Sequence, residues 1–415
     1  MRRAHSWARG KGQWQPANQA HVFAYVVLRF SVISHCKPRK DCPMTDPAAA
    51  LLDTPALLLD EARMERNISR LARHAEALGV ALRPHLKTAK SIEVARRLTG
   101  GTPGPITVST LAEAEVFFAA GHSDILYAVG IAPQKLKRIQ DLREKGCDLV
   151  VILDNEAQAQ AAAEASVPAM IEIDSDGHRG GLRPDDPALV EVGRILHAAE
   201  CLRGVMTHAG ESYTVRGAAA HADFAEQERK AAVTAAENLR GAGLSCPVVS
   251  IGSTPTAHAA RDLTGVTELR AGVYMFFDLV MAGIDVCTQD DIALSVLTTV
   301  IGHQPAKGWT MIDAGWMAMS RDRGTAAQDV DQGYGLVCDE TGQILTDYIV
   351  VSANQEHGII AQREGANPPP LDLPVGTRLR ILPNHACATA AQHDRYHLVR
   401  QDGGPLDVWP RFNGW

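Results

Sequence analysis

The chain has 415 residues, of which 46% are hydrophobic and 21% charged, so it is long enough for two globular domains or for one large barrel with an appendage. Its net charge of −7 argues against a general attraction to nucleic acid or to an anionic membrane surface. The eight cysteines are scattered and form no CxxC pair, which is typical of reduced thiols in an enzyme of this size.

Residues 1–43 differ in composition from the rest of the chain. They contain eight Lys or Arg residues and one acid, Asp41. Their most apolar part, residues 21–35, is interrupted by Arg29 and is too short to span a bilayer. We therefore expect a disordered or non-native extension at 1–43, no membrane partner and a cytoplasmic location.

From Pro55 to residue 283, short apolar runs alternate with amphipathic helical segments such as 61–78, which is followed by Gly79. This alternation predicts parallel βαβ units, and the number of units favours a (β/α)8 barrel over a doubly wound open sheet. The predicted strands are 55–60, 80–84, 106–109, 124–128, 149–153, 169–173, 204–208, 248–251 and 268–272.

The pattern changes near residue 284. The strand-like segments 292–301, 308–313, 348–352 and 377–382 are separated by turns that contain Gly or Pro, and no long helical pattern follows. Residues 284–415 are therefore predicted to form a second, mainly β domain, and 55–283 the barrel. We expect a strand at about 44–54 to join the second domain.

One lysine stands where a barrel enzyme would place a catalytic group. The segment RPHLKT (83–88) follows a predicted strand, so Lys87 is expected at the mouth of the barrel. A partly desolvated amine is nucleophilic and can form a Schiff base with an aldehyde cofactor. On position alone, an ordinary surface lysine is the competing interpretation.

Two neighbouring segments late in the strand order could bind a phosphate. Gly252-Ser-Thr-Pro-Thr256 offers hydroxyls and backbone N–H groups after one strand, and Gly272-Val-Tyr274 follows the next. Phosphate sites in barrels often lie at this place. A simple turn before a helix is the alternative.

The pair His385 and Cys387 lies in the predicted β domain. In an extended segment, which we expect here, both side chains would point to one face. Imidazole and thiolate suit zinc or a similar metal, and a pair of ligands leaves positions open for water and substrate. A structural histidine beside a buried cysteine is the other interpretation.

In combination, these segments resemble a known family, the D-serine dehydratase and D-threonine aldolase group of fold-type III pyridoxal 5′-phosphate (PLP) enzymes. The similarity extends from about residue 48 to the C-terminus. The motifs that carry it, in chain order, are RPHLKT (83–88), TVSTLAEAE (107–115), EIDSDGHR (172–179), THAGESY (207–213), GSTPT (252–256), RAGVY (270–274), NQEHG (354–358) and PNHAC (383–387).

The resemblance implies an alanine-racemase-like (β/α)8 barrel with a second β domain, in a homodimer. It also implies that Lys87 carries PLP and that a divalent metal, Zn or Mn, binds His385 and Cys387. The residues expected to bind the cofactor are Lys87, His85, His208, Tyr213, Gly252, Ser253, Thr254, Gly272 and Tyr274.

The implied reaction is the dehydration of a β-hydroxy D-amino acid to a 2-oxo acid and ammonia. Lys87 would remove the Cα proton, and the metal would assist loss of the β-hydroxyl. In the aldolase branch an Asp tends to replace the cysteine found here, so Cys387 favours a dehydratase. The segments 313–325 and 408–415 resemble the branch of the family that acts on 3-hydroxyaspartate, and the expected substrate is D-threo-3-hydroxyaspartate or D-serine.

A second carboxylate on the substrate would need a cationic partner, for which Arg179, Arg321 and Arg323 are candidates. The main alternative activity is retro-aldol cleavage to glycine and an aldehyde. An amino-acid racemase, which usually needs a second base, and a PLP-binding protein without catalysis are further alternatives. The predicted β domain with its His-x-Cys pair argues against the last of these.

Overall fold

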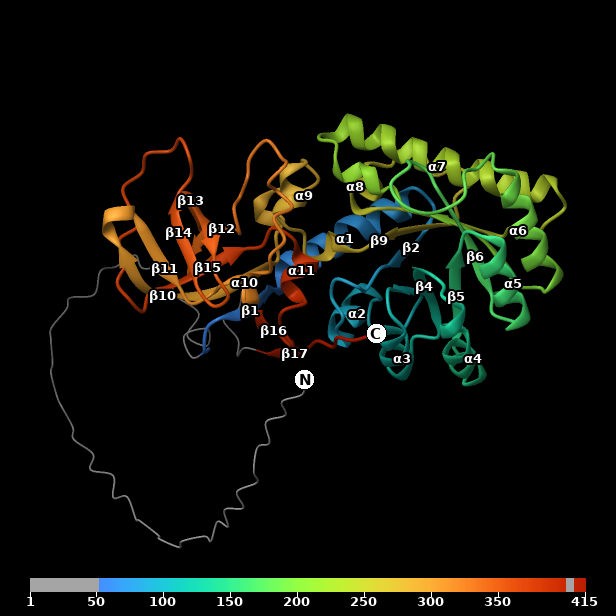
Figure 1. Cartoon of the computed structure of the whole chain (residues 1–415), viewed down its shortest axis with the longest axis horizontal. Coiled ribbons are helices and arrows are strands. Elements are labelled where there is room, and N and C mark those ends of the chain that lie inside the picture. Colours follow the sequence, from blue (N-terminus) through green and yellow to red (C-terminus); the bar gives the residue numbers. More distant parts are fainter. Residues whose placement is uncertain (1–51, 401–406) are drawn as a thin grey trace, which may run out of the picture. The chain divides into compact units, whose positions relative to one another are not determined.

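The barrel is formed by eight strands that pair in parallel in the order β2-β9-β8-β7-β6-β5-β4-β3 (Figure 1). This computed structural model describes residues 52–400 and 407–415. A bridge between His85 and Thr107 connects the two outer strands and closes the sheet, as the sequence predicted. The strands are β2 (Ala81–Pro84), β3 (Ile106–Val108), β4 (Asp124–Gly130), β5 (Asp148–Leu153), β6 (Ala169–Ile173), β7 (Leu202–Thr207), β8 (Val248–Ile251) and β9 (Glu268–Ala271).

Helices surround the barrel strands, and several begin at residues that cap them. The side chains of Thr110 and Asn155 accept hydrogen bonds from the backbone N–H groups of Glu113 and Gln158, which satisfies donors that a helix start leaves free. The helices are α1 (Glu61–Ala77), α2 (Ile92–Leu98), α3 (Leu111–Ala119), α4 (Leu136–Glu144), α5 (Glu156–Glu164), α6 (Pro187–Ala198), α7 (Ala218–Gly241) and α8 (Thr254–Ala259).

The second domain is built on a nine-stranded sheet with the order β11-β14-β13-β12-β15-β10-β1-β16-β17. Strand β11 pairs with both β14 and β10, so six of these strands close on themselves. This confirms the mainly β character that the sequence predicted. The strands are β1 (Ala56–Asp60), β10 (Leu294–Gln304), β11 (Trp309–Ile312), β12 (Leu336–Asp339), β13 (Ile344–Ala353), β14 (Gly358–Gln362), β15 (Arg378–Leu382), β16 (Arg395–Val399) and β17 (Val408–Pro410).

The structure corrects the assignment of the first predicted strand. Ala56–Asp60 lies in the nine-stranded sheet, antiparallel to β10 and parallel to β16, and not in the barrel. Its apolar residues are buried on both faces, and a short apolar run of this kind is equally compatible with either sheet. Most of the strand expected at 44–54, and the whole extension at 1–43, lie outside the described residues.

Three short helices lie within or beside the second domain: α9 (Leu279–Gly283), α10 (Trp316–Met319) and α11 (Ala386–Ala390). Among the described residues, no helix is long and apolar enough to cross a membrane.

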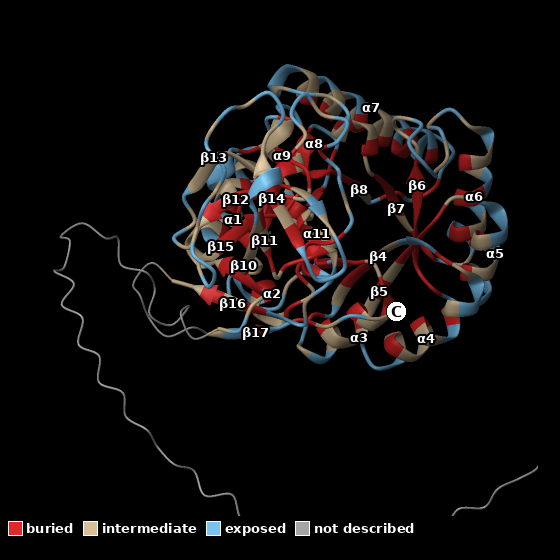
Figure 2. Cartoon of the chain, turned by 60° about the vertical axis from the view of Figure 1, so that its left-hand side comes forward, coloured by how far each residue is buried: buried red, intermediate tan, exposed pale blue. Residues whose placement is uncertain are grey.

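Buried residues follow the barrel strands and the inner faces of the helices around them (Figure 2). Inside the barrel, Leu126, Ile152, Met170 and Met206 form a small apolar cluster from four successive strands. Burying each such side chain stabilises the fold by about 1.5–3 kcal/mol. The cluster fills the barrel, as expected for a packed core that leaves only its ends for other uses.

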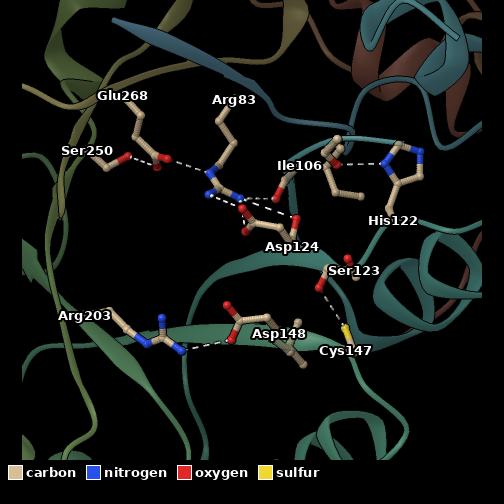
Figure 3. Close-up of polar contacts among 12 residues, drawn as sticks. Arg83, Ile106, His122, Ser123, Asp124, Cys147, Asp148, Arg203, Ser250 and Glu268 are labelled. Atoms are coloured by element: carbon tan, nitrogen blue, oxygen red, sulfur yellow. Dashed lines mark hydrogen bonds and ion pairs between the residues drawn. The ribbon is translucent and has the colours of Figure 1, made fainter. Parts of the chain in front are cut away.

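Charged side chains close the end of the barrel where the strands begin, which we call the floor (Figure 3). Arg83 lies 2.8 Å from Glu268 on β9 and 2.8 Å from Asp124 on β4. On the other side of the floor, Arg203 pairs with Asp148 at 3.1 Å. These ion pairs connect strands that are distant in the sequence, so the floor serves to hold the barrel together.

Candidate active site

A cavity of about 430 Å³ opens at the opposite end of the barrel, where the strands finish. Its wall combines loops that follow β2, β7, β8 and β9 with side chains of the second domain. It contains all but one of the residues that the sequence singled out for the cofactor and the metal, namely His85, Lys87, His208, Tyr213, Gly252, Ser253, Thr254, Gly272, His385 and Cys387.

Tyr274 is the exception. It lies in a short 3-10 turn, Val273–Met275, and does not line the cavity; its ring centroid is 6.4 Å from that of His258. The ring is fully buried, and burial raises the pKa of its hydroxyl. The hydroxyl has no hydrogen-bond partner among the described residues, and the expected role of Tyr274 in binding the cofactor stays a prediction.

Lys87 is an exposed residue on the loop after β2, with its side chain in the cavity wall. The loop is a tight turn in which the Lys90 N–H donates to the Leu86 carbonyl at 2.8 Å. No ion pair engages Lys87 within residues 52–400 and 407–415, so its amine is available to a ligand.

Two histidines share the cavity wall with Lys87, and both are held in the neutral form. Burial, helped by the charge of Lys87, lowers the pKa of His85 well below its ordinary value and that of His208 to about 3. His208 donates from Nδ1 to the Gly252 carbonyl at 3.1 Å. Its ring is thereby oriented, with the other nitrogen left as an acceptor.

The loop after β8 presents a hydroxyl without a partner. Thr254 Oγ1 is buried, and no hydrogen-bond partner is found for it in the described part of the chain. Gly252 has a φ of +134°, and a Cβ there would lie 2.0 Å from the Arg270 carbonyl oxygen. A side chain at this position would therefore displace the loop.

A buried carboxylate holds this loop in place. Glu228 on α7 accepts hydrogen bonds from the N–H groups of Ala209 (2.9 Å) and Gly252 (3.0 Å) and from the Thr256 hydroxyl (2.7 Å). Burial raises the pKa of Glu228 to about 6, although these hydrogen bonds favour its ionised form. Sequence reasoning missed this residue, because a lone Glu in a long helix resembles a solvated one.

The His-x-Cys pair adopts a local structure different from the one expected. Residues 386–390 form helix α11 and not an extended segment, and His385 precedes the helix. The residue that follows His385 donates its N–H to the buried carboxylate of Asp278 at 2.9 Å. The pair still faces the cavity, because both residues lie at the start of α11.

Asp322 and Thr88 fix the two side chains of the pair. His385 Nδ1 lies 2.5 Å from Asp322 Oδ2, and Cys387 Sγ lies 3.0 Å from Thr88 Oγ1. Burial opposes the charge on His385, but Asp322 and Cys387 outweigh it and raise its pKa to about 11. Burial likewise opposes a thiolate at Cys387, yet His385, Lys87 and Thr88 lower its pKa.

Few other side chains near this pair could act as metal ligands. The described ranges hold no group of three or more His, Cys, Asp or Glu side chains arranged to hold a metal ion. A metal bound by His385 and Cys387 would therefore complete its coordination with water or substrate, which is the arrangement of a catalytic rather than a structural site.

Of the three arginines proposed to bind a second carboxylate of the substrate, one lines the cavity and two do not. Arg179 lies in its wall, 4.0 Å from Glu172. Arg321 stacks on the ring of Trp316, and Arg323 pairs with Asp331 at 2.5 Å, and neither lines the cavity. Among these three arginines, only Arg179 is therefore placed to contact a ligand in the cavity.

A further arginine in the wall was not anticipated. Arg270 on β9 is buried inside the barrel and donates to Ser250 Oγ and to the Thr207 carbonyl. Burial lowers the pKa of Arg270. An arginine that interrupts an apolar strand in the segment RAGVY was the available indication.

Two family profiles match consecutive parts of the chain. The profile "Alanine racemase, N-terminal domain" matches residues 59–280, and the profile "Putative serine dehydratase domain" matches residues 293–399.

Three proteins of known activity are similar over most of their length. The chain is 55% identical to D-threo-3-hydroxyaspartate dehydratase of Delftia sp. (strain HT23), covering 88% of this chain and 98% of that protein. It is 31% identical to D-threonine aldolase of Arthrobacter sp (88% and 93% covered) and 29% identical to D-serine dehydratase of Dictyostelium discoideum (88% and 98% covered). The solved structure of the Delftia enzyme superposes with a TM-score of 0.87 at 54% identity, over 89% of this chain and 100% of that one.

Proposed function

Because the chain belongs to the alanine-racemase-like family that contains D-threo-3-hydroxyaspartate dehydratase, D-serine dehydratase and D-threonine aldolase, we propose that it is an ammonia-lyase of β-hydroxy D-amino acids that depends on PLP and a divalent metal. One observation carries the proposal. The loop of Lys87 and the pair His385 and Cys387 lie in one cavity, joined by the 3.0 Å contact between Thr88 and Cys387. The lysine amine and the proposed metal ligands would thus face the same substrate.

The residues of the cavity fit PLP. The unpartnered hydroxyl of Thr254, with Ser253 and the Gly252 loop, offers donors for a phosphate, and Lys87 Nζ would carry the cofactor aldehyde. His85, His208 and Gly272 would border the cofactor ring. When bound, PLP stores the negative charge left at Cα, and that chemistry belongs to the cofactor.

Lys87 would act as the base. Its Nζ would accept the proton from Cα of the substrate. Because His85 and His208 are neutral, they add no positive charge that would oppose protonation of the lysine. Loss of the Cα proton and of the β-hydroxyl would together remove water from the substrate, and hydrolysis would then give a 2-oxo acid and ammonia.

The pair His385 and Cys387 fits a borderline metal such as zinc. Asp322 occupies His385 Nδ1, which leaves Nε2 for the metal, and such a carboxylate partner orients metal-binding histidines in many proteins. The metal would act as a Lewis acid on the β-hydroxyl, a poor leaving group on its own. Cys387 favours this role over the aldolase reaction, for which an Asp is expected at this position.

We propose 3-hydroxy-D-aspartate as substrate ahead of D-serine. The support is the 55% identity to the Delftia dehydratase, together with the cation of Arg179 in the cavity wall. Retro-aldol cleavage to glycine and an aldehyde is the second candidate, since an aldolase is 31% identical. A homodimer and a cytoplasmic location remain predictions from the sequence.

Product analysis tests the proposal. The protein, supplied with PLP and Mn²⁺ or Zn²⁺, should release ammonia and a 2-oxo acid from D-threo-3-hydroxyaspartate, and more slowly from D-serine. Exhaustive chelation should abolish turnover, and metal should restore it. Glycine and an aldehyde in place of ammonia would assign the chain to the aldolases, and full activity after chelation would remove the metal from the mechanism.

A further inference from the structure

The loop that carries Lys87 is bonded to the C-terminal part of the chain at three successive residues. Thr88 contacts Cys387, and the Ala89 carbonyl accepts from the Tyr396 hydroxyl at 2.7 Å. The Lys90 carbonyl accepts from the Phe412 N–H at 3.0 Å. The lysine and the proposed metal ligands thus come from opposite ends of the chain, yet they are connected by short contacts.

Arg411 lies at the centre of these contacts. It is only 7% exposed, and its Nε donates to the Ala89 carbonyl at 3.1 Å and to the Tyr396 hydroxyl at 2.8 Å. Its Nη1 donates to the carbonyl of Ala390, the last residue of α11, and to that of His393 at 2.8 Å. One guanidinium group therefore joins the Lys87 loop to the helix that begins at the His385 and Cys387 pair.

The segment that carries Arg411 is itself anchored on the barrel. The Trp409 ring lies under the guanidinium of Arg97 at 5.4 Å, and the Phe412 ring meets Phe117 edge-on at 5.1 Å. Arg97 and Phe117 belong to α2 and α3, the first two helices after the Lys87 loop. The segment is thus packed against the barrel on both sides of Arg411.

We propose that Arg411 is a positioning residue that sets the distance between the Lys87 amine and the metal held by His385 and Cys387. A reacting centre tolerates errors of only about 0.5 Å between its groups. The buried guanidinium contacts Ala89 of the Lys87 loop on one side and Ala390 and His393, at the end of α11 and just after it, on the other. It can therefore fix their separation, which a flexible lysine could not do with its single point charge. This inference rests on the proposed metal site but not on the identity of the substrate.

The test compares R411M with wild type in the PLP-loaded protein. We expect R411M to raise the dissociation constant of Zn²⁺ or Mn²⁺, measured by equilibrium dialysis, by about 10- to 100-fold, as loss of a residue that supports metal ligands commonly does. The kcat should fall by a similar factor, with PLP content and the KM for the D-amino acid little changed. R411K, which keeps the charge and part of the hydrogen bonding, should recover part of both losses.

R395M is the matched control. Arg395 lies on the same strand as Tyr396, is 52% exposed and pairs only with the adjacent Asp394 in the described structure. R395M should leave metal affinity and kcat unchanged. If R411M fails to fold, the variant Y396F provides the test instead. It removes the Tyr396 hydroxyl, which donates to the Ala89 carbonyl and accepts from Arg411 Nε. Y396F should weaken metal binding in the same way as R411M, by a smaller factor.

The outcomes separate the inference from the proposed function. Unchanged metal affinity in folded R411M, or in Y396F if R411M is unfolded, overturns the role of Arg411 while the dehydratase proposal stands. A wild-type protein that binds no metal overturns both this role and the metal site. Weaker metal binding in R411M supports the role, whichever products the enzyme forms.

Discussion

The two ends of the barrel contain similar side chains but use them in opposite ways. On the floor, Arg83 is bonded to both Glu268 and Asp124. At the mouth, Lys87 has no ionic partner within the described ranges, and the Thr254 hydroxyl is buried without a hydrogen bond. A buried hydroxyl is normally hydrogen-bonded, so Thr254 and the unpaired Lys87 are the groups at the mouth that a ligand could engage. Charge on the floor maintains the fold, and charge at the mouth is available for chemistry.

Removing Lys87 should produce the largest effect on activity and almost none on stability. K87A deletes the amine proposed to carry PLP and to accept the Cα proton, so kcat should fall by about 10⁴-fold. Because Lys87 is exposed and unpaired, the free energy of unfolding of the protein without cofactor should change by less than about 0.5 kcal/mol. Steady-state kinetics and urea unfolding measure the two effects.

Lys145 provides the comparison for this variant. It is exposed at the end of α4, on the outside of the barrel, and K145A should leave both quantities unchanged. Substantial turnover by K87A would show that another group is the base.

Breaking the floor should have the converse effect. R83M removes the arginine from Glu268, whose side chain is only 10% exposed, and from Asp124, which is 50% exposed. The uncompensated charge of the buried Glu268 should lower the free energy of unfolding by about 3 kcal/mol. The kcat of the folded protein should stay within about threefold of wild type, because no floor residue reaches the cavity. Urea unfolding and kinetics below the unfolding transition measure both.

The neighbouring pair of Arg203 and Asp148 calibrates this result. Its side chains are 40% and 47% exposed, and an exposed ion pair contributes less than about 1 kcal/mol, so R203M should be nearly neutral. A large loss of kcat in folded R83M would break the comparison between the two ends. It would indicate that Glu268 acts on Arg270 at the mouth through the Ser250 hydroxyl, which touches both.

The sequence was informative where function depends on local order. The position of Lys87 directly after a strand predicted its place in the cavity, because parallel strands all end at one mouth. The strand Ala56–Asp60 was misplaced because its buried apolar residues look the same in either sheet, and only pairing with β10 and β16 distinguishes them. Periodicity therefore predicted elements and the fold class better than it assigned each strand to a sheet.

Contacts between distant segments could not be read from the pattern. Asp322 binds His385 across 63 positions of sequence, and Arg411 reaches Ala89 across 322. The helix after His385 was also missed, because HAC has no periodicity to reveal it. Family resemblance identified the residues at the centre of the site, whereas the groups that orient them emerged only from the fold.

The smallest effect expected at the mouth is a pH dependence of stability that comes from Glu228. Its carboxylate accepts three hydrogen bonds, but it is buried. Burial raises its pKa to about 6, above an ordinary value of 4.5. The folded protein thus holds this proton more tightly than the unfolded chain, so the stabilisation is fully present below pH 4.5 and is lost as the pH rises through about 6. The shift corresponds to about 2 kcal/mol.

The variant E228Q should abolish this dependence. From below about pH 4.5 to above about pH 7, its free energy of unfolding relative to wild type should rise by about 2 kcal/mol, measured by urea titration without cofactor. E237Q, at an exposed position of the same helix, should follow the wild-type curve. Parallel curves for E228Q and wild type would mean that the three hydrogen bonds to Glu228 fully offset its burial. Glu228, which holds the loop after β8, would then resemble the hydrogen-bonded charges of the floor. Only Lys87 and Thr254 would still distinguish the mouth from the floor.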